Sequence, residues 1–156
     1  MRLHISLIVT VPAGIGGETA HAVGALLRQA GVTRVDTTEE LFDTAMLLAT
    51  QPVPKGRRVA ILTNAGGPGI LATDACESVG LELAELSPAT VAKLARFLPP
   101  EASLDNPVDM IASATADHFA QAVPALLDAP GVDSLLVIFV PPLMIETADV
   151  ARAVRR

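Results

Sequence analysis

The sequence predicts an α/β protein in which helices cover both faces of a mostly parallel β-sheet. Hydrophobic residues make up 51% of the chain and aromatic residues only 3%, a composition that suits the fully buried strands of parallel sheets. Residues 59–62 and 133–140 are short, largely apolar runs, as expected for such strands. From residue 58 onward strand and helix patterns alternate, which implies right-handed crossovers and three layers, αβα.

A small β/α segment is predicted ahead of this domain, over residues 1–51. Its expected elements are a strand at 3–11, a glycine-rich turn, a helix at 18–30, a strand at 32–35 and a helix from 37 onward. Gly31 is placed to end the first helix as a C-terminal cap. Thr37 and Glu40 have the spacing of a capping box, which opens the second helix.

Residues 52–57 are the predicted linker between this segment and a domain at 58–156. Pro52 and Pro54 flank Val53, and a glycine and several cations follow. Prolines and glycine in such a cluster are typical of a connection rather than of a helix or strand. Because the sequence ends inside a predicted helix, we expect the second domain to be truncated at its C-terminus.

The second domain begins with a strand, a glycine-rich turn and a helix. Residues 64–69 read Asn-Ala-Gly-Gly-Pro-Gly, and we expect Gly66, Gly67 and Gly69 to take positive φ and to let another group approach the backbone. A helix after such a turn presents free amides and a partial positive charge, which suit a phosphate or carboxylate. A purely structural sharp turn explains these residues equally well.

The later predicted elements are a strand at 81–86, a helix at 88–98, a loop at 101–109, a helix at 116–127 with a kink or early end at Pro124, a strand at 133–140 and a last helix from 145 or 146.

Several other classes of site are disfavoured. A net charge of −6 and the absence of Trp and Tyr argue against nucleic-acid binding, which needs a basic face and stacking aromatic rings. Cys76 is the only cysteine, which excludes an intrachain disulfide, and its place in a helix favours a buried, unreactive thiol. His4, His21 and His118 lack metal-ligand spacing, so no metal site is expected. The apolar run at 3–11 is too short to span a membrane, and a cytoplasmic location is expected.

Ligands of open parallel sheets bind beyond the carboxyl ends of the strands. The loops at 64–69, 106–109 and 140–145 are expected at that edge. The polar residues they bring together are Thr63, Asn64, Asn106, Asp109 and Glu146. The sequence therefore predicts a binding edge and assigns no catalytic residue.

Four segments, in one order, carry a resemblance to a known family. They read Gly-Arg-Arg-Val-Ala-Ile-Leu-Thr-Asn-Ala-Gly-Gly-Pro-Gly at 56–69, Asp-Asn-Pro-Val-Asp at 105–109, Gly-Val-Asp-Ser-Leu-Leu-Val-Ile-Phe-Val-Pro-Pro at 131–142 and, upstream, Ala-Leu-Leu-Arg-Gln-Ala-Gly-Val-Thr-Arg-Val-Asp-Thr-Thr-Glu-Glu-Leu-Phe at 25–42. The first three resemble the ligase-CoA domain of ADP-forming acetate–CoA ligases, and residues 25–42 resemble the segment that precedes it. This domain is similar to the carboxy-terminal part of the succinyl-CoA synthetase β subunit and also occurs in bacterial protein lysine acetyltransferase fusions. The resemblance covers roughly residues 22–156 and implies a flavodoxin-like fold for residues 58–156.

The resemblance implies the reaction of an acid–thiol ligase. Acyl-CoA, ADP and phosphate are interconverted with the free acid, CoA and ATP, through an acyl phosphate and a phosphorylated histidine. The helix after the glycine turn would face the phosphohistidine and stabilise its charge. The residues expected to hold the phosphoryl group are Gly66, Gly67 and Gly69, with Asn64 as a side-chain donor, and Asn106 and Asp109 are expected to support the neighbouring loop. CoA, and ADP or ATP with Mg²⁺, are the cofactors implied for the complete enzyme.

The chain departs from the family pattern near its beginning. The phosphorylated histidine of the family lies in a Ser-His-Thr-Gly run, whereas Pro12 falls near that place here and His21 lies too close to the following segment to take the role. The expected partners are a CoA-binding Rossmann domain and an ATP-grasp domain, in the same enzyme or in a partner subunit. Ligase activity is expected only in combination with them, and self-association into a homo-oligomer is a further expectation.

Two alternatives to a ligase domain stay open. The chain fits a non-catalytic regulatory or binding module of a protein acetyltransferase fusion, and it also fits a free-standing flavodoxin-like binder of a small anion. The sequence does not specify which carboxylic acid a ligase of this kind would use.

Overall fold

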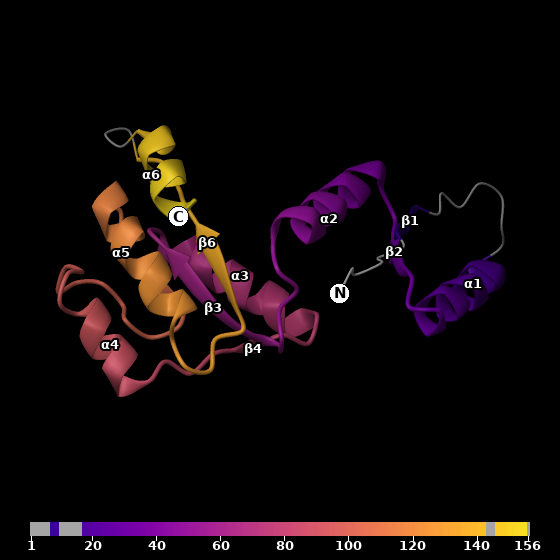
Figure 1. Ribbon diagram of the computed structural model, residues 1–156, viewed down its shortest axis with the longest axis horizontal. Helices are drawn as coiled ribbons and strands as arrows, with labels where there is room; N and C mark the ends of the chain where they lie inside the picture. Colours follow the sequence, from indigo (N-terminus) through magenta and orange to yellow (C-terminus); the bar gives the residue numbers. More distant parts are fainter. Residues whose placement is uncertain (1–6, 10–16, 143–145, 156) are drawn as a thin grey trace. The chain divides into compact units, whose positions relative to one another are not determined.

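The computed structural model describes residues 7–9, 17–142 and 146–155. The chain divides into two compact units, Met1–Val53 and Pro54–Arg156, whose elements are labelled in Figure 1.

The first unit is a small β/α segment. β1 (Leu7–Val9) and β2 (Thr33–Val35) form a two-stranded parallel sheet, and α1 (Gly17–Gln29) connects them. α2 (Thr38–Thr50) follows with its predicted capping box, in which the Thr37 hydroxyl accepts the Glu40 N–H at 3.1 Å and the Glu40 carboxylate accepts the Thr37 N–H at 3.3 Å. The N-terminal β/α segment is thus confirmed. The predicted turn at 12–16, most of the predicted strand at 3–11 and His4 lie outside the described residues.

The second unit contains a sheet of four parallel strands. Its elements are β3 (Arg58–Thr63), α3 (Gly66–Ser78), β4 (Glu82–Leu83), α4 (Pro88–Leu94), β5 (Val108–Asp109), α5 (Ala116–Leu127), β6 (Ser134–Ile138) and α6 (Thr147–Val154). β3 is central: β6 pairs with it on one side, and β4 and then β5 pair with it on the other. The predicted α/β fold with a parallel sheet is confirmed.

Side chains of β3 alternate between two hydrophobic cores, one on each face of the sheet. Val59 and Ile61 pack with Cys76 of α3, whereas Leu62 packs with residues of α4, α5 and α6. Every residue of β3 after Arg58 is buried, which explains why this strand is a continuous apolar run in the sequence. Cys76 is a buried free thiol, as predicted.

Some element boundaries differ from the prediction. β5 lies within the segment predicted to be a loop, and α4 ends at Leu94, earlier than expected. α5 continues through Pro124 to Leu127. A proline inside a helix loses one backbone hydrogen bond, and burial of Val123, Ala125 and Leu126 on either side of it offsets that loss.

Candidate functional site

The candidate site lies at the carboxyl edge of the sheet in the second unit. Three parallel strands end there, β3 at Thr63, β5 at Asp109 and β6 at Ile138. The register pairs Thr63 directly with both Asp109 and Ile138. The predicted convergence of the loops that follow β3 and β5 is therefore present, at the edge where parallel sheets bind ligands.

The first turn of α3 leaves its amide groups available. Ala65 is the N-cap and has no side chain that could cap the helix. Gly66 and Gly67 are the first two helical residues, so their N–H groups have no carbonyl one turn earlier to bind. Pro68 has no N–H, and the Gly69 N–H donates to the Ala65 carbonyl at 3.3 Å. Two free amides and the positive end of the helix dipole thus face the same edge.

The three glycines of this turn differ in their surroundings. A Cβ on Gly67 would have no heavy atom within 4 Å, and one on Gly66 would lie 3.0 Å from Oδ2 of Asp109. A Cβ on Gly69 would lie 3.1 Å from Cγ2 of Thr63 and 3.5 Å from Cβ of Pro107. Gly69 is therefore required for close packing, whereas Gly67 is open to approach. The expectation of positive φ was wrong for all three, because they lie inside the helix rather than in a turn before it.

Asn64 is buried and braces the turn. Its Nδ2 donates to the carbonyl of Val140 at 2.8 Å, and its Oδ1 accepts the N–H of Val140 at 2.8 Å. Thr63 fixes the same turn from within, since its hydroxyl accepts the N–H of Ala65 at 3.0 Å. The glycine turn and the end of β6 are thus held together by side chains of β3 and of the turn itself. A phosphate contact by Asn64 stays a prediction.

The side chain of Asn106 joins β3 to Ala84, the residue that follows β4. Its Oδ1 accepts the N–H of Ile61 at 2.9 Å, and its Nδ2 donates to the carbonyls of Val59 at 2.8 Å and Ala84 at 3.0 Å. β4 leaves β3 after Val59, and β5 joins β3 only at Leu62. Between Val59 and Leu62 neither β4 nor β5 pairs with β3. The side-chain amide of Asn106 hydrogen-bonds to the β3 backbone in this gap. The peptide bond between Asn106 and Pro107 is cis.

Asp109 lies next to the start of α3. Its Oδ1 accepts the N–H of Ile111 at 2.9 Å, and its Oδ2 is the atom that a Cβ on Gly66 would approach. Ile111 has a φ of +58°, which is unfavourable for a β-branched residue. Ile111 is not marked in the sequence, because no sequence pattern identifies a β-branched residue in this conformation. In this turn, Oδ2 of Asp109 lies beside Gly66, the first residue of α3.

Glu146 is less closely tied to the site. It is the N-cap of α6, its side chain makes no capping hydrogen bond, and it is exposed. The residues between Pro142 and Glu146 lie outside the described part of the chain.

A bidentate ion pair lies at the opposite end of the sheet from the candidate site. Arg58 donates from Nε and Nη2 to the two carboxylate oxygens of Asp133, at 2.8 and 2.9 Å, and its backbone N–H donates to Oδ2 at 3.0 Å. These hydrogen bonds lower the pKa of Asp133 from 3.8 to about 2. The pair fastens the amino ends of β3 and β6 and takes no part in the candidate site.

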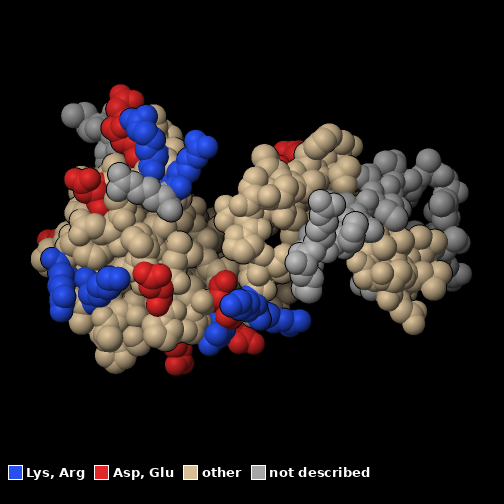
Figure 2. Space-filling view, in the orientation of Figure 1, with Lys and Arg blue, Asp and Glu red and all other residues tan. Residues whose placement is uncertain are grey.

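On the face shown in Figure 2, acidic and basic side chains of the second unit are interspersed. In the described ranges, no group of three or more His, Cys, Asp or Glu side chains is arranged to hold a metal ion. None of the described helices is long and apolar enough to cross a membrane.

The fold and the site define an α/β domain that presents an uncapped helix N-terminus at the carboxyl edge of a parallel sheet. Residues 59–155 match the family model described as the ligase-CoA domain. The chain belongs to this family, the ligase-CoA domain of ADP-forming acetate–CoA ligases.

Curated relatives share this region. The chain is 48% identical over 118 residues to acetate–CoA ligase [ADP-forming] II subunit alpha of Pyrococcus furiosus, a match that covers 76% of this chain and 26% of the relative. It is 40% identical to acetate–CoA ligase [ADP-forming] I of Archaeoglobus fulgidus, over 85% of this chain and 19% of the relative. The 4-hydroxybutyrate–CoA ligase [ADP-forming] of Nitrosopumilus maritimus is 38% identical over 75% of this chain and 17% of its own length. The chain thus spans about a quarter or less of these relatives.

A solved structure supports the same assignment. The dinucleotide-forming acetyl-coenzyme A synthetase 1 of Ca. Korarchaeum cryptofilum, in its complex with phosphate and ADP, is similar with a TM-score of 0.81 and 30% identity. The match covers 90% of this chain and 30% of that chain.

Proposed function

We propose that the chain is the ligase-CoA component of an ADP-forming acyl-CoA ligase, and that the N-terminus of α3 faces the phosphoryl group during transfer. The observation that carries this proposal is the open environment of Gly67, beside the free amides of the first helical turn. An anion can approach these amides without displacing any side chain at Gly67.

The chain's own contribution to the reaction is electrostatic and positional. The N–H groups of Gly66 and Gly67 donate to phosphoryl oxygens, and the helix dipole stabilises their charge. Donors held in place before the reaction stabilise developing charge without reorganisation. Asn64 and Thr63 hold the turn in this geometry through the hydrogen bonds to Val140 and Ala65.

Asp109 sets the side from which the phosphoryl group approaches. Its carboxylate lies on the side of Gly66 where a Cβ would stand, and it repels an anion from that side of the residue. The phosphoryl group therefore takes the side of Gly67, and the carboxylate is left to accept a hydrogen bond from a donor on the presenting group.

The outer face of α3 has an exposed apolar surface that a partner domain could cover. Ile70 and Leu71 follow Gly67 by three and four residues, so all three share one face of the helix. The two side chains are 64% and 70% exposed. A partner domain that presents a phosphorylated side chain to Gly67 would cover this apolar margin and exclude water from the transfer.

CoA, and ADP or ATP with Mg²⁺, are assigned to partner domains, a CoA-binding Rossmann domain and an ATP-grasp domain. The relatives contain much sequence that this chain does not match. The relatives named as acetate–CoA ligase and 4-hydroxybutyrate–CoA ligase both match this chain. Because ligases for different acids share this region, we assign the choice of acid to the partner domains as well. The cytoplasm, where ATP and CoA are available, is the proposed location.

Reconstitution tests the proposal. The chain is mixed with a CoA-binding and ATP-grasp partner, and acyl-CoA-dependent ATP formation is measured. The chain is expected to raise the rate over that of the partner alone, and Gly67→Val is expected to abolish the gain, because the added side chain occupies the approach to the amides. No gain from the wild-type chain would contradict the ligase role.

A free-standing anion binder is the second candidate, favoured by the same open helix end. Calorimetry with inorganic phosphate, CoA and ADP distinguishes it. The free-standing binder would be favoured over the ligase by two results together. The chain alone would bind phosphate and lose that binding in Gly67→Val, and the wild-type chain would give no gain in reconstitution.

A further inference from the structure

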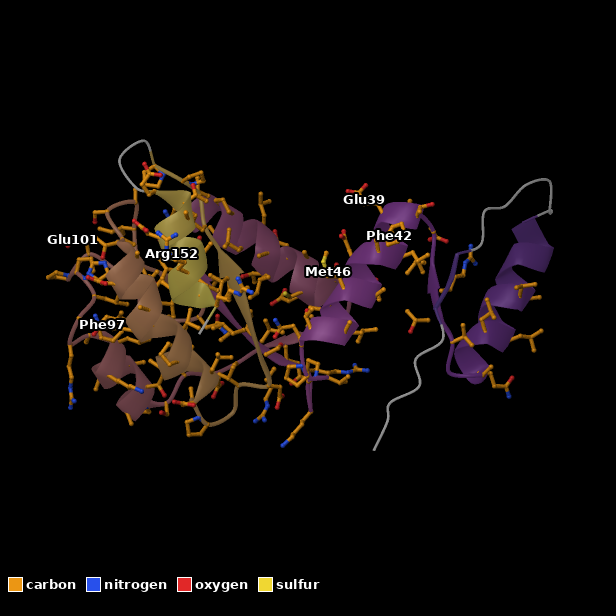
Figure 3. The ribbon with its side chains drawn as sticks, turned by 45° about the horizontal axis from the view of Figure 1, so that its top comes forward. Glu39, Phe42, Met46, Phe97, Glu101 and Arg152 are labelled. Carbon is orange, nitrogen blue, oxygen red and sulfur yellow. The ribbon has the colours of Figure 1, made fainter. Side chains whose placement is uncertain are left out.

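The segment that follows β5 is fixed at both ends and exposed between them. Met110 and Ala114 are completely buried, and the N–H of Met110 donates to the carbonyl of Thr63, the last residue of β3, at 2.8 Å. Ala114 precedes α5, which packs beside α6, the helix on which Figure 3 labels Arg152. Residues 111–113, which we name the strap, are exposed or half-buried. The strap can therefore change its conformation with little loss of core packing at either end.

The strap begins in a conformation that its sequence does not favour. Ile111 has a φ of +58°, and among the described residues it is the only one other than glycine with a positive φ. In this left-handed conformation the Cβ of an L-residue crowds the following carbonyl oxygen, and a branched Cβ adds to the crowding. Glycine takes the same conformation without this strain. Strain of this kind persists only where the surrounding structure holds the residue in place.

The Asp109 carboxylate holds Ile111 in this conformation. Its Oδ1 accepts the N–H of Ile111 at 2.9 Å, and the Ile111 carbonyl in turn accepts the N–H of Ala114 at 3.1 Å. A hydrogen bond to an ionised carboxylate is stronger than one to a neutral acceptor. Oδ2 of the same carboxylate lies beside Gly66. The charge that holds the strap therefore lies at the edge of the candidate site.

We propose that Asp109 and Ile111 form a latch, in which the carboxylate holds the strap in its strained conformation and releases it when Oδ2 binds a hydrogen-bond donor. A donor at Oδ2 draws negative charge away from Oδ1 and weakens its hold on the Ile111 N–H. Ile111 then relaxes to a negative φ, and the strap turns beside the start of α3. The latch couples the arrival of the presenting group to this movement, a coupling that rests on the proposed function.

Hydrogen exchange of the folded full chain tests the hold of the carboxylate. The Ala114 amide reports on the turn, because it donates to the carbonyl of Ile111. Asp109→Ala is expected to speed exchange of this amide at least about tenfold, and Asp109→Asn, which keeps a neutral acceptor, is expected to speed it less. Asp105→Ala is the matched control, because Asp105 is an exposed carboxylate four residues earlier, and its Ala114 amide is expected to exchange as in the wild type.

Substitution of Ile111 tests the strain. Ile111→Gly and Ile111→Ala both remove the isoleucine side chain, but only glycine takes a positive φ without strain. Ile111→Gly is therefore expected to unfold at about 0.5 M higher urea than Ile111→Ala. When Ile111→Gly is combined with Asp109→Ala, the loss of the carboxylate is expected to change exchange at Ala114 by less than about threefold, because the turn no longer needs it.

The reconstituted ligase tests the coupling to transfer. Ile111→Gly has no strain to release, so it is expected to form ATP at least about threefold more slowly than Ile111→Ala, although it is the more stable of the two. Equal rates, or a faster Ile111→Gly, would overturn the coupling, since a purely structural role predicts no loss from the more stable variant.

The latch itself would be overturned by any of three results. These are exchange at Ala114 no faster in Asp109→Ala than in Asp105→Ala, an equally large effect of Asp109→Ala in the Ile111→Gly background, and an Ile111→Gly variant no more stable than Ile111→Ala. If the wild-type chain gives no gain in reconstitution, the proposed function is contradicted instead, and the exchange and urea results still decide the latch.

Discussion

Gly67 and Gly69 are two residues apart in the first turns of α3, and the same substitution is expected to have opposite effects on them. A Cβ at Gly67 meets no atom within 4 Å, whereas a Cβ at Gly69 lies 3.1 Å from Cγ2 of Thr63 and 3.5 Å from Cβ of Pro107. Gly67→Ala gains helix propensity without a clash, which is worth up to about 1 kcal/mol. Gly69→Ala forces a methyl group into a packed interior, which costs about 1–3 kcal/mol.

Urea unfolding of the full chain, followed by far-UV circular dichroism, measures this difference. With a slope of about 1–3 kcal/mol per molar urea, Gly69→Ala is expected to lower the midpoint by about 1 M, and Gly67→Ala is expected to leave it unchanged or raise it. Equal losses of stability in the two variants would show that Gly67 is not open in the folded protein. That result would remove the observation on which the proposed phosphoryl site rests.

The same pair of variants separates stability from function. In the reconstituted ligase, Gly67→Ala is expected to lower the rate of ATP formation at least about tenfold, a loss of about 1.4 kcal/mol of transition-state stabilisation. Gly69→Ala, assayed well below its unfolding temperature, is expected to keep most of the wild-type rate. A Gly67→Ala variant with full activity would mean that no group approaches this glycine during transfer.

Three further predictions concern the side chains around the sheet. Asn106→Ala removes three hydrogen bonds to the backbone of β3 and of Ala84, and it is expected to lower the free energy of unfolding in urea by about 3 kcal/mol. Asp105→Ala, at the exposed neighbouring residue, should change it by less than about 0.5 kcal/mol, and equal effects would contradict the bridging role of Asn106. Because hydrogen bonds from Arg58 lower the pKa of Asp133 to about 2, the stability that this pair contributes is present above pH 3.8 and is lost as the pH falls toward 2. Asp133→Asn should therefore flatten the dependence of unfolding on pH in that range, and an unchanged profile would argue against the pair. Asp109→Asn removes a negative charge beside the start of α3 and keeps an Oδ1 acceptor, so calorimetry should show tighter phosphate binding; weaker binding would show that the carboxylate assists the anion.

The sequence predicts the elements whose burial is uniform and misses those that depend on distant contacts. β3 is buried on both faces and is therefore visible as an uninterrupted apolar run. β5 is only two residues long, and the gap between it and β4 is closed by the side chain of Asn106. An Asn-Pro pair indicates a turn in the sequence, because nothing local reveals that the Asn106 amide reaches β3 and the residue after β4.

The sequence predicts the sheet edge at which the loops after β3 and β5 meet, but it does not predict the contacts of the residues there. The edge of the sheet follows from the alternation of strands and helices. Which glycine is open and which is packed depends on Thr63 and Pro107, which approach Gly69 from β3 and from the loop before β5. Asn64 resembles a ligand donor in the sequence, whereas in the structure both ends of its amide are bound to Val140. Both outcomes depend on tertiary contacts between segments far apart in the chain.

Amide chemical shifts of the ¹⁵N-labelled full chain test the proposed phosphoryl site at the start of α3. Inorganic phosphate is titrated into the protein, and the shift of every assigned backbone amide is followed, with Gly67→Val as the comparison. The amide signals of Gly66 and Gly67 are expected to move most in the wild type and to stay in place in the variant. Phosphate-dependent shifts elsewhere on the chain, with these two amides unmoved, would contradict a phosphoryl site at the start of α3.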